Sequence, residues 1–257
     1  MKMADSNRRK FMFFLVLFAV CLSFFNAGCG LDVLAEILDD PFSVENQPNS
    51  ESSFDTCYFK FSTRRLSNAN DMGRAYIYYK IYNDDQKVSS EESSLISKAD
   101  DSVGKLSSAT YMRETYGYKQ LHYITSAGAS SSAFDLSNAR HDIRIRLTNY
   151  SDEIDDYSAA IFIDEQKVGI PVRMNGKTFD FGRDGSDDEN PANTHNEENA
   201  ASSDTKGFLQ KQDDGEENIF YVAMFGVFEQ PNDTWDPVFS PIHFLGRVKI
   251  NANERNN

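Results

Sequence analysis

The sequence has few of the residues that build disulfide-stapled domains or nucleic-acid-binding surfaces. Its 257 residues include three cysteines, too few for a disulfide framework. Lys and Arg number 26 against 40 Asp and Glu, which gives a net charge of −14. Binding to nucleic acid depends on basic side chains that displace counterions from phosphate, so this balance argues against nucleic acid as a partner. The length allows one domain or two small ones.

Motifs of catalysis and metal binding are also missing. The sequence has no G-x-S-x-G, H-E-x-x-H, Walker or G-x-G-x-x-G pattern. Its four histidines are scattered, and none has a second His or Cys at metal-ligand spacing: His122, His141, His195 and His243. We therefore predict no catalytic residue, no metal site and no cofactor other than a covalent lipid, and we expect a protein that is not an enzyme.

Long apolar runs are rare, and the one that stands out lies at the N-terminus. Lys2, Arg8, Arg9 and Lys10 precede the uncharged stretch 11–25. A basic start, a short apolar stretch and small residues at its end are typical of a secretory signal peptide. The stretch is also shorter than the ~20 apolar residues of a bilayer-spanning helix. Residues 1–28 are therefore predicted to be a signal peptide.

The segment ends in a cysteine, which changes its expected processing. Ala27-Gly28-Cys29 resembles a bacterial lipobox, although Asn26 stands where an aliphatic residue is common. The resemblance implies that Cys29 takes a diacylglycerol and an acyl group and becomes the first residue. Two or more acyl chains are enough for stable anchoring. The expected location is therefore the cell envelope, membrane-anchored, at the outer membrane or the periplasmic face. Plain secretion and an uncleaved anchor are the alternatives.

Residues 29–53 have the composition of a tether between lipid and domain. Leu31 to Leu38 has apolar residues at helical spacing and predicts either a short helix or a partly ordered lead-in. Residues 43–52 are mostly polar, with a proline and no aromatic residue. The removed segment is basic, so the mature chain is still more acidic, and we expect it to stand off anionic headgroups.

Residues 54–250 show mostly a period of two, which indicates half-buried strands. Residues 54–63, 74–82 and 141–150 alternate most clearly, and Asn175-Gly176 predicts a two-residue hairpin turn of type I′. A second tight turn is predicted at 164–167. Roughly eight to ten strands without a long helix favour an all-β antiparallel sandwich, immunoglobulin-like or jelly-roll, followed by a tail at 251–257.

Three segments depart from this pattern. Glu91 to Ala99 predicts a short helix, and Ser126 to Ser137 a loop. Residues 184–205 contain seven acidic residues and neither Lys nor Arg, which predicts a disordered loop within the domain. Acidic clusters at 152–156, 184–189 and 213–217 lack the spacing of a calcium-binding EF-hand, so weak divalent binding is the most they indicate.

Cysteine and aromatic residues provide the remaining candidates. Cys57 is in phase with Phe59 and Phe61, so we expect it in the core. Trp235, the single tryptophan, is a candidate ligand-binding residue that stacks on a sugar or anchors a protein partner; the alternative is that it covers the sandwich edge. Residues 76, 78 and 82 are tyrosines on one strand face, which is either an exposed platform or a second side of the core.

Residues 25–30 and the ending PVFSPIHFLGRVKI together resemble small lipoproteins of treponeme-like spirochaetes. The resemblance implies an envelope location and carries over no functional residue beyond Cys29. The leading hypothesis is a lipid-anchored binding module for an envelope or host protein or a glycan. The alternatives are a carbohydrate-binding or carbohydrate-processing sandwich, and a structural envelope protein without a discrete ligand.

Overall fold

The computed structural model describes residues 42–63, 73–82, 84–99, 105–136, 139–150, 157–174, 176–179, 219–230 and 238–251. These residues belong to one compact unit. The predicted signal peptide, Cys29, the stretch Leu31 to Leu38, the three acidic clusters, the segment 184–205, Trp235 and the tail from 252 onward lie outside the described residues.

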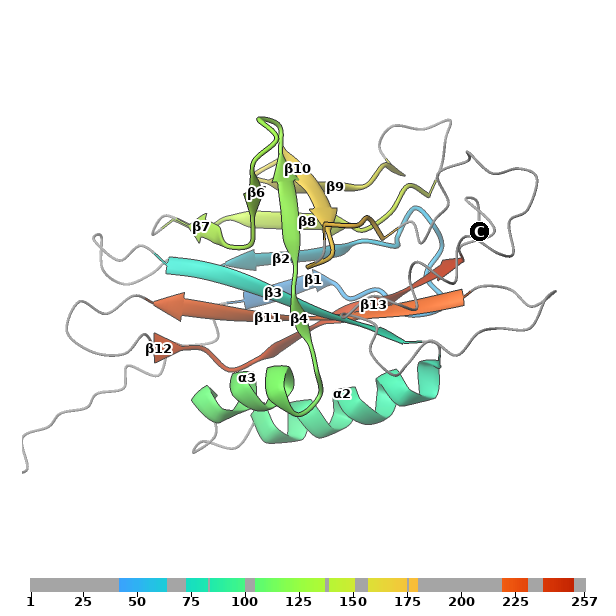
Figure 1. Ribbon diagram of the computed structural model, residues 1–257, viewed down its shortest axis with the longest axis vertical. Coiled ribbons are helices and arrows are strands. Elements are labelled where there is room, and N and C mark those ends of the chain that lie inside the picture. Colours follow the sequence, from blue (N-terminus) through green and yellow to red (C-terminus); the bar gives the residue numbers. More distant parts are fainter. Residues whose placement is uncertain are drawn as a thin grey trace, which may run out of the picture. The chain divides into compact units, whose positions relative to one another are not determined.

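Most of the described chain forms antiparallel strands in two sheets (Figure 1). Sheet A has seven strands in the order β1-β2-β8-β9-β10-β5-β6, and sheet B has the order β12-β11-β3-β4, with β13 beside β11 and β7 beside β3. The strands of sheet A are β1 (Phe42–Asn46), β2 (Phe59–Thr63), β8 (Asp142–Arg146), β9 (Ala160–Ile163), β10 (Gln166–Val172), β5 (His122–Thr125) and β6 (Ser130–Ser131). Those of sheet B are β3 (Gly73–Tyr82), β4 (Lys119–Gln120), β7 (Phe134–Leu136), β11 (Ile219–Gln230), β12 (Val238–Phe239) and β13 (His243–Asn251).

The alternation predicted from the sequence separates the two faces of sheet A. Phe59, Phe61, Ile143, Ile145 and Ile161 are fully buried. They stand opposite one another across β2, β8 and β9, so they form one face of a shared core. The all-β antiparallel sandwich is thereby confirmed.

One segment connects the two sheets at Leu121. Strand β4 pairs with β3 in sheet B, and β5 begins two residues later and pairs with β10 in sheet A. The buried Leu121 lies between them, and its N–H donates to the carbonyl of Ile77 at 2.7 Å. The chain therefore crosses from one sheet to the other without a loop.

Two helices cover the outer face of sheet B (Figure 1). They are α2 (Asp85–Ala99) and α3 (Lys105–Glu114). Val88 and Leu95 of α2 and Met112 of α3 are fully buried, in a cluster with residues of β3 and β11. Tyr78 and Tyr82 belong to this cluster, so the tyrosine face of β3 is a second side of the core and not a platform.

The length of α2 corrects the sequence prediction, which placed a short helix at 91–99 and none at 85–90. Five of its fifteen residues are serine, a weak helix former that competes for backbone hydrogen bonds. Ser89, Ser93 and Ser94 each bond the carbonyl four residues earlier. Tertiary packing of one apolar stripe therefore stabilises a helix that propensity alone does not favour.

The N-terminal part of the domain also differs from the prediction. Residues 43–52 were assigned to a tether, but β1 pairs antiparallel with β2. Phe42 is 3% exposed and lies edge-on to Phe61 and Phe228. Pro48 accepts a hydrogen bond from the N–H of Arg247 in β13. This segment is polar because one of its faces is exposed, which is why its composition resembles a linker.

The turn predicted at 164–167 is present, and the one predicted at Asn175-Gly176 has a different length, with Asn175 itself outside the described residues. Asp164 and Glu165 have φ angles of 49° and 66°, which gives a two-residue type I′ turn between β9 and β10. At Gly176 (φ 82°) the Arg173 N–H donates to the Lys177 carbonyl, so the loop encloses three positions where two were predicted. The expected loop at 126–137 contains the short strands β6 and β7.

Within the described residues, no helix combines the length and apolar character needed to cross a membrane.

Candidate functional site

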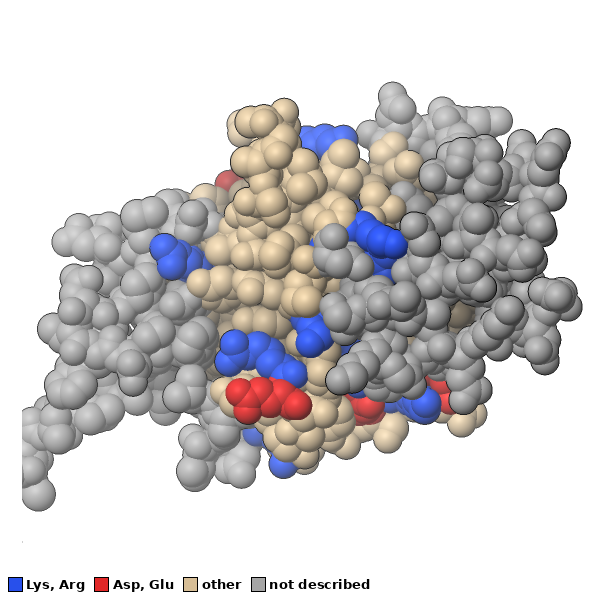
Figure 2. Space-filling view, in the orientation of Figure 1, with Lys and Arg blue, Asp and Glu red and all other residues tan. Residues whose placement is uncertain are grey.

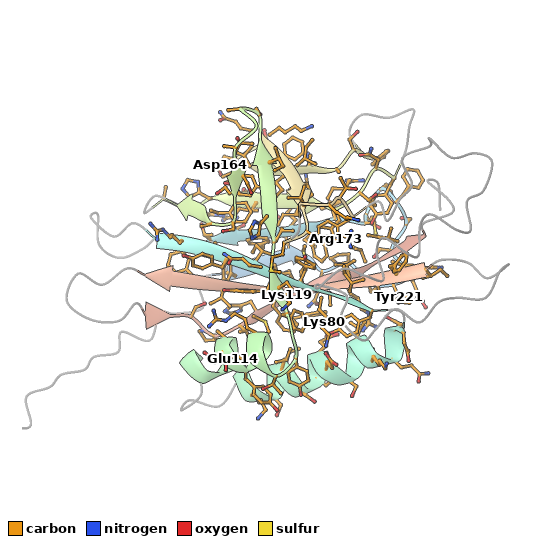
Figure 3. All side chains as sticks on the ribbon, in the orientation of Figure 1. Lys80, Glu114, Lys119, Asp164, Arg173 and Tyr221 are labelled. Carbon is orange, nitrogen blue, oxygen red and sulfur yellow. The ribbon has the colours of Figure 1, made fainter. Side chains whose placement is uncertain are left out.

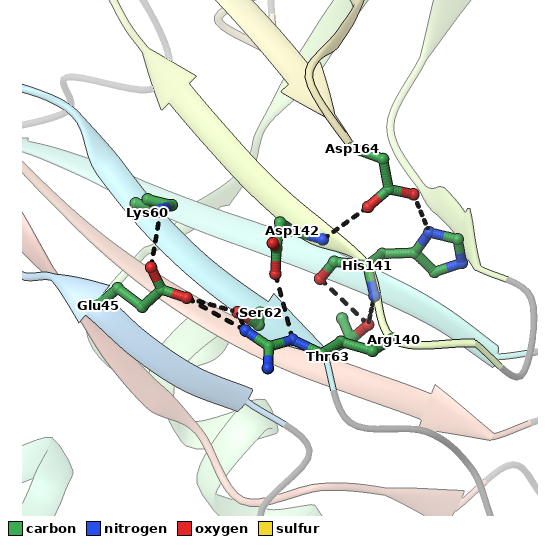
Figure 4. A network of polar contacts seen from close by, with 8 residues as sticks. All are labelled: Glu45, Lys60, Ser62, Thr63, Arg140, His141, Asp142 and Asp164. Atoms are coloured by element: carbon green, nitrogen blue, oxygen red, sulfur yellow. Dashed lines mark hydrogen bonds and ion pairs between the residues drawn. The ribbon is translucent and has the colours of Figure 1, made fainter.

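A network of charged side chains lies at one end of β1, β2 and β8 (Figure 4). Glu45 pairs with Lys60 at 2.7 Å and with Arg140 at 3.3 Å, and it accepts a hydrogen bond from Ser62. Arg140 also pairs with Asp142 at 3.3 Å and donates to the Ser62 hydroxyl. The hydrogen bond from Lys60 lowers the pKa of Glu45, and Glu45 raises the pKa of Lys60. These side chains are largely exposed, so the pairs contribute little to stability.

His141 extends this network toward the turn between β9 and β10 (Figure 4). Its Nδ1 lies 2.6 Å from Asp164 Oδ2, while Asp164 Oδ1 accepts the N–H of Asp142 at 2.9 Å. Burial raises the pKa of the Asp164 carboxyl, but the bonds from Asp142 and His141 outweigh it and leave the pKa below its ordinary value. Because the type I′ turn fixes Asp164, the pair holds the start of β8 against the turn.

His141 and Asp164 have the chemistry of two members of a catalytic triad. A triad also needs a hydroxyl on the imidazole that the carboxylate orients. The two hydroxyls of the network have other roles: Ser62 bonds Glu45 and Arg140, and Thr63 accepts the backbone N–H of His141 at 3.0 Å. A search of the described residues finds no group of three or more metal-ligating side chains. We interpret the network as a structural one that holds the ends of neighbouring strands together.

A second feature crosses the outer face of sheet A. The register places Lys60 opposite Arg144, Arg144 opposite Phe162, and Phe162 opposite Lys167. We call these four residues the basic–aromatic row. The residues on either side of Lys60 and Arg144 are buried in the core, as is Ile161 before Phe162. All four side chains of the row are partly or fully exposed, so the row faces solvent. The Arg144 guanidinium lies over the Phe162 ring at 4.4 Å.

Aromatic rings continue beside the row. Arg146 is buried between the rings of Tyr58 and Tyr157, at 5.3 and 4.9 Å. It donates to the carbonyl of Phe54 at 2.9 Å, and burial lowers its pKa. Arg146 therefore fixes two partly exposed tyrosines at the edge of the row.

A buried charged pair lies on the other side of the molecule, between sheet B and α2 (Figure 3). Lys80 is 3% exposed and pairs with Glu91 at 2.6 Å. Tyr82 donates to the same carboxylate at 2.9 Å and bonds the Tyr118 hydroxyl at 2.8 Å. Burial lowers the pKa of Lys80 and raises the pKa of both tyrosines. Because α2 covers this cluster, we interpret the cluster as holding the helix against sheet B and not as a substrate site.

Cys57 lies in the core, as predicted. It is 2% exposed, its Sγ lies 3.2 Å from the Tyr150 hydroxyl, and burial raises its pKa. A high pKa and burial make a poor nucleophile.

The histidines that the structure describes are not brought together. His122 lies in β5 and His141 before β8, while His243 begins β13 and lies edge-on to Phe42. His195, Cys29 and Trp235 are outside the described residues.

The basic–aromatic row was missed because it depends on strand pairing. Alternation places Arg144 on the solvent face of its strand, but Lys60 and Lys167 belong to segments far away in the sequence. A pairing register for β2, β8, β9 and β10 is the signal that brings them into line.

Fold and surface together define an all-β sandwich with a helical layer on one sheet. No family model, no curated protein and no solved structure matches the chain.

Proposed function

We propose that this protein is a lipid-anchored bacterial cell-envelope protein whose β-sandwich binds a partner through the outer face of sheet A. The carrying observation is the basic–aromatic row in a chain of net charge −14. Within the described residues, Arg144 and Lys167 have no carboxylate partner. Cations exposed in this way are available to a ligand.

The layering supports the choice of this face. Sheet B is covered by α2 and α3, which bury its aromatic residues. In Figure 2 most of the visible Asp and Glu side chains lie over the helices, while Lys and Arg also lie over the strands. A negatively charged partner is attracted to the cations over the strands.

The proposed anchor is Cys29, and its tether is shorter than predicted because β1 begins at Phe42, within the predicted tether. Residues 30–41 separate Cys29 from the first strand, twelve positions in place of the longer linker predicted from composition. A fully extended chain of that length spans about 40 Å. The binding face would then work within a few tens of ångströms of the bilayer.

Two measurements on the full-length chain made in a bacterial host test this proposal. Mass spectrometry of the N-terminal peptide should give a chain that begins at Cys29 with added acyl mass, whereas Cys29→Ser should retain its signal peptide. An unmodified thiol after cleavage refutes the anchor.

The binding face is tested by photocrosslinking in cells. A benzoylphenylalanine in place of Phe162 should give discrete crosslinked species. The same residue in place of Arg113, which is exposed on α3, should not. Equal crosslinking from both positions, or none from either, refutes the assignment of the face.

A carbohydrate partner is the second candidate function, and the partly exposed rings of Tyr58, Tyr157 and Phe162 favour it. Aromatic rings pack against the apolar faces of sugars, and their low conformational entropy makes them efficient contact residues.

A further inference from the structure

The geometry of the basic–aromatic row selects among negatively charged ligands. Neighbouring strands are ~4.8 Å apart, so Lys60 and Lys167, three strands apart, lie about 14 Å from each other across the sheet. The row is therefore long enough for several repeating units of an extended polymer that lies across the strands.

Arg144 is the best positioned cation of the row. Its guanidinium lies over the Phe162 ring, 4.4 Å from the ring centre, and this contact restricts its motion before any ligand binds. A planar guanidinium presents two N–H groups in the geometry of a carboxylate. Lys60 and Lys167 stand on either side as more mobile point charges; Lys60 is partly neutralised by Glu45, and Lys167 is exposed.

Acidic side chains next to the row narrow the choice further. Asp142 and Asp164 lie on the same end of the sheet, with side chains 48% and 51% exposed. They repel any anionic polymer, and the phosphates of a nucleic acid offer no hydroxyl group in compensation. A polymer of sugar carboxylates offsets this repulsion, because its hydroxyl groups can donate hydrogen bonds to Asp142 and Asp164.

We propose that the outer face of sheet A binds an acidic polysaccharide. Arg144 holds a carboxylate of the sugar, Lys60 and Lys167 bind neighbouring carboxylates, and Phe162 with Tyr58 supplies the apolar surface against which sugar rings pack. This inference rests on the proposed binding role and names its ligand class.

The test uses the full-length chain in detergent and polygalacturonate as the probe, with binding measured by calorimetry at low and at moderate salt. Methyl-esterified polygalacturonate is the matched neutral polymer, since it has the same sugars without the charges. Polyglutamate and an oligo-dT strand represent acidic protein and nucleic acid. Polygalacturonate should bind, more weakly at higher salt, and the other three should bind at least tenfold more weakly.

Variants assign the contacts. Arg144→Lys keeps the charge and loses the two-pronged geometry, so affinity should fall about tenfold. Lys167→Glu should weaken binding about fivefold, and Phe162→Leu, which keeps an apolar side chain, should also weaken it about fivefold. Arg113→Glu makes the same charge change on α3 and should bind as the wild type does. Unfolding of each variant in urea identifies any that lose the fold, and conclusions are drawn from the folded ones.

Every other outcome overturns the proposal. No binding of polygalacturonate, equal binding of its methyl ester, or unchanged affinity in all three row variants removes the acidic polysaccharide. Equal binding of polyglutamate or oligo-dT makes the face a general anion-binding surface. The proposed function fails separately, through an unlipidated Cys29 or through crosslinking from Phe162 that is no greater than from Arg113.

Discussion

The ion pair of Lys80 and Glu91 makes the sharpest prediction about stability. Lys80 is almost fully buried under α2, and Glu91, 21% exposed on its side chain, is its carboxylate partner at 2.6 Å. Replacing Glu91 by Gln removes the counter-charge that lies 2.6 Å from the buried ammonium. Breaking a buried pair in this way costs ~3–5 kcal/mol. Because Glu91 is partly open to water, we expect a loss near the lower end, about 3 kcal/mol.

The matched variants separate charge from packing. Lys80→Met keeps the volume of the side chain and leaves Glu91 with the hydroxyl of Tyr82 and some water, so it should cost only ~1 kcal/mol. The double variant, in which no buried charge is left unpaired, should cost less than Glu91→Gln alone. The double-mutant cycle should therefore give a coupling of about 2 kcal/mol.

Urea unfolding followed by far-ultraviolet circular dichroism measures these differences, with unchanged m-values as the sign that the transition is still the same. For a domain of this size, a loss of ~3 kcal/mol lowers Tm by about 6–12 °C. If Glu91→Gln costs less than about 0.5 kcal/mol, the pair is of the ordinary surface type. The account of how α2 is held is then wrong.

Three further predictions concern other parts of the fold. Gly246 has φ 121°, and an added Cβ would lie 2.6 Å from Pro48, so Gly246→Ala should lower the free energy of unfolding in urea by at least about 2 kcal/mol. The control is Gly117→Ala, at φ 75° with open space around it, which should lower the same free energy by about 1 kcal/mol. The Cys57 thiol should fail to react with Ellman's reagent in the native protein, in a chain with Cys21→Ser and Cys29→Ser that has no other thiol, and react fully in denaturant; prompt native reaction contradicts its burial. The lowered pKa of Asp164 means that its stabilisation is present above its unfolded pKa and is lost as pH falls through the folded value; Asp164→Asn should therefore be less stable at pH 7 and flatten the loss of stability in acid, below the ordinary pKa of a carboxyl, and identical acid unfolding curves refute this role.

The sequence was sufficient to predict the fold where periodicity and burial coincide. In β2 and β8 one face is apolar and the other is polar, so alternation identified both the strands and their buried residues, including Cys57. It was insufficient where both faces are buried. On β3 the second face lies under α2, and nothing in its tyrosines distinguishes a covered surface from an exposed one.

The candidate site was less predictable than the fold for a similar reason. Local motifs describe residues that are close in the sequence, whereas the row brings together positions 60, 144, 162 and 167 through strand order. Local composition also led to wrong predictions. The serine-rich sequence of α2 hid the first part of a helix, and the polar sequence of β1 was assigned to a tether. In both segments a single buried stripe, Val88 and Leu95 in one and Phe42 in the other, outweighs a composition that is typical of a loop.

The position of the proposed binding face follows from the asymmetry of the layers. A two-sheet sandwich has two outer faces. In this protein α2 and α3 cover the outer face of sheet B, where tyrosines and phenylalanines would otherwise be exposed. Sheet A carries cations on its outer face: Arg144 is stacked on Phe162, and Lys167 is exposed without a carboxylate partner in the described part of the chain. In a chain with 14 more negative than positive charges, cations gathered on one sheet make that sheet attractive to an anionic ligand. The β1 edge, where the proposed tether enters, belongs to the same sheet. An anchored domain of this kind would hold its ligand close to the membrane from which it extends.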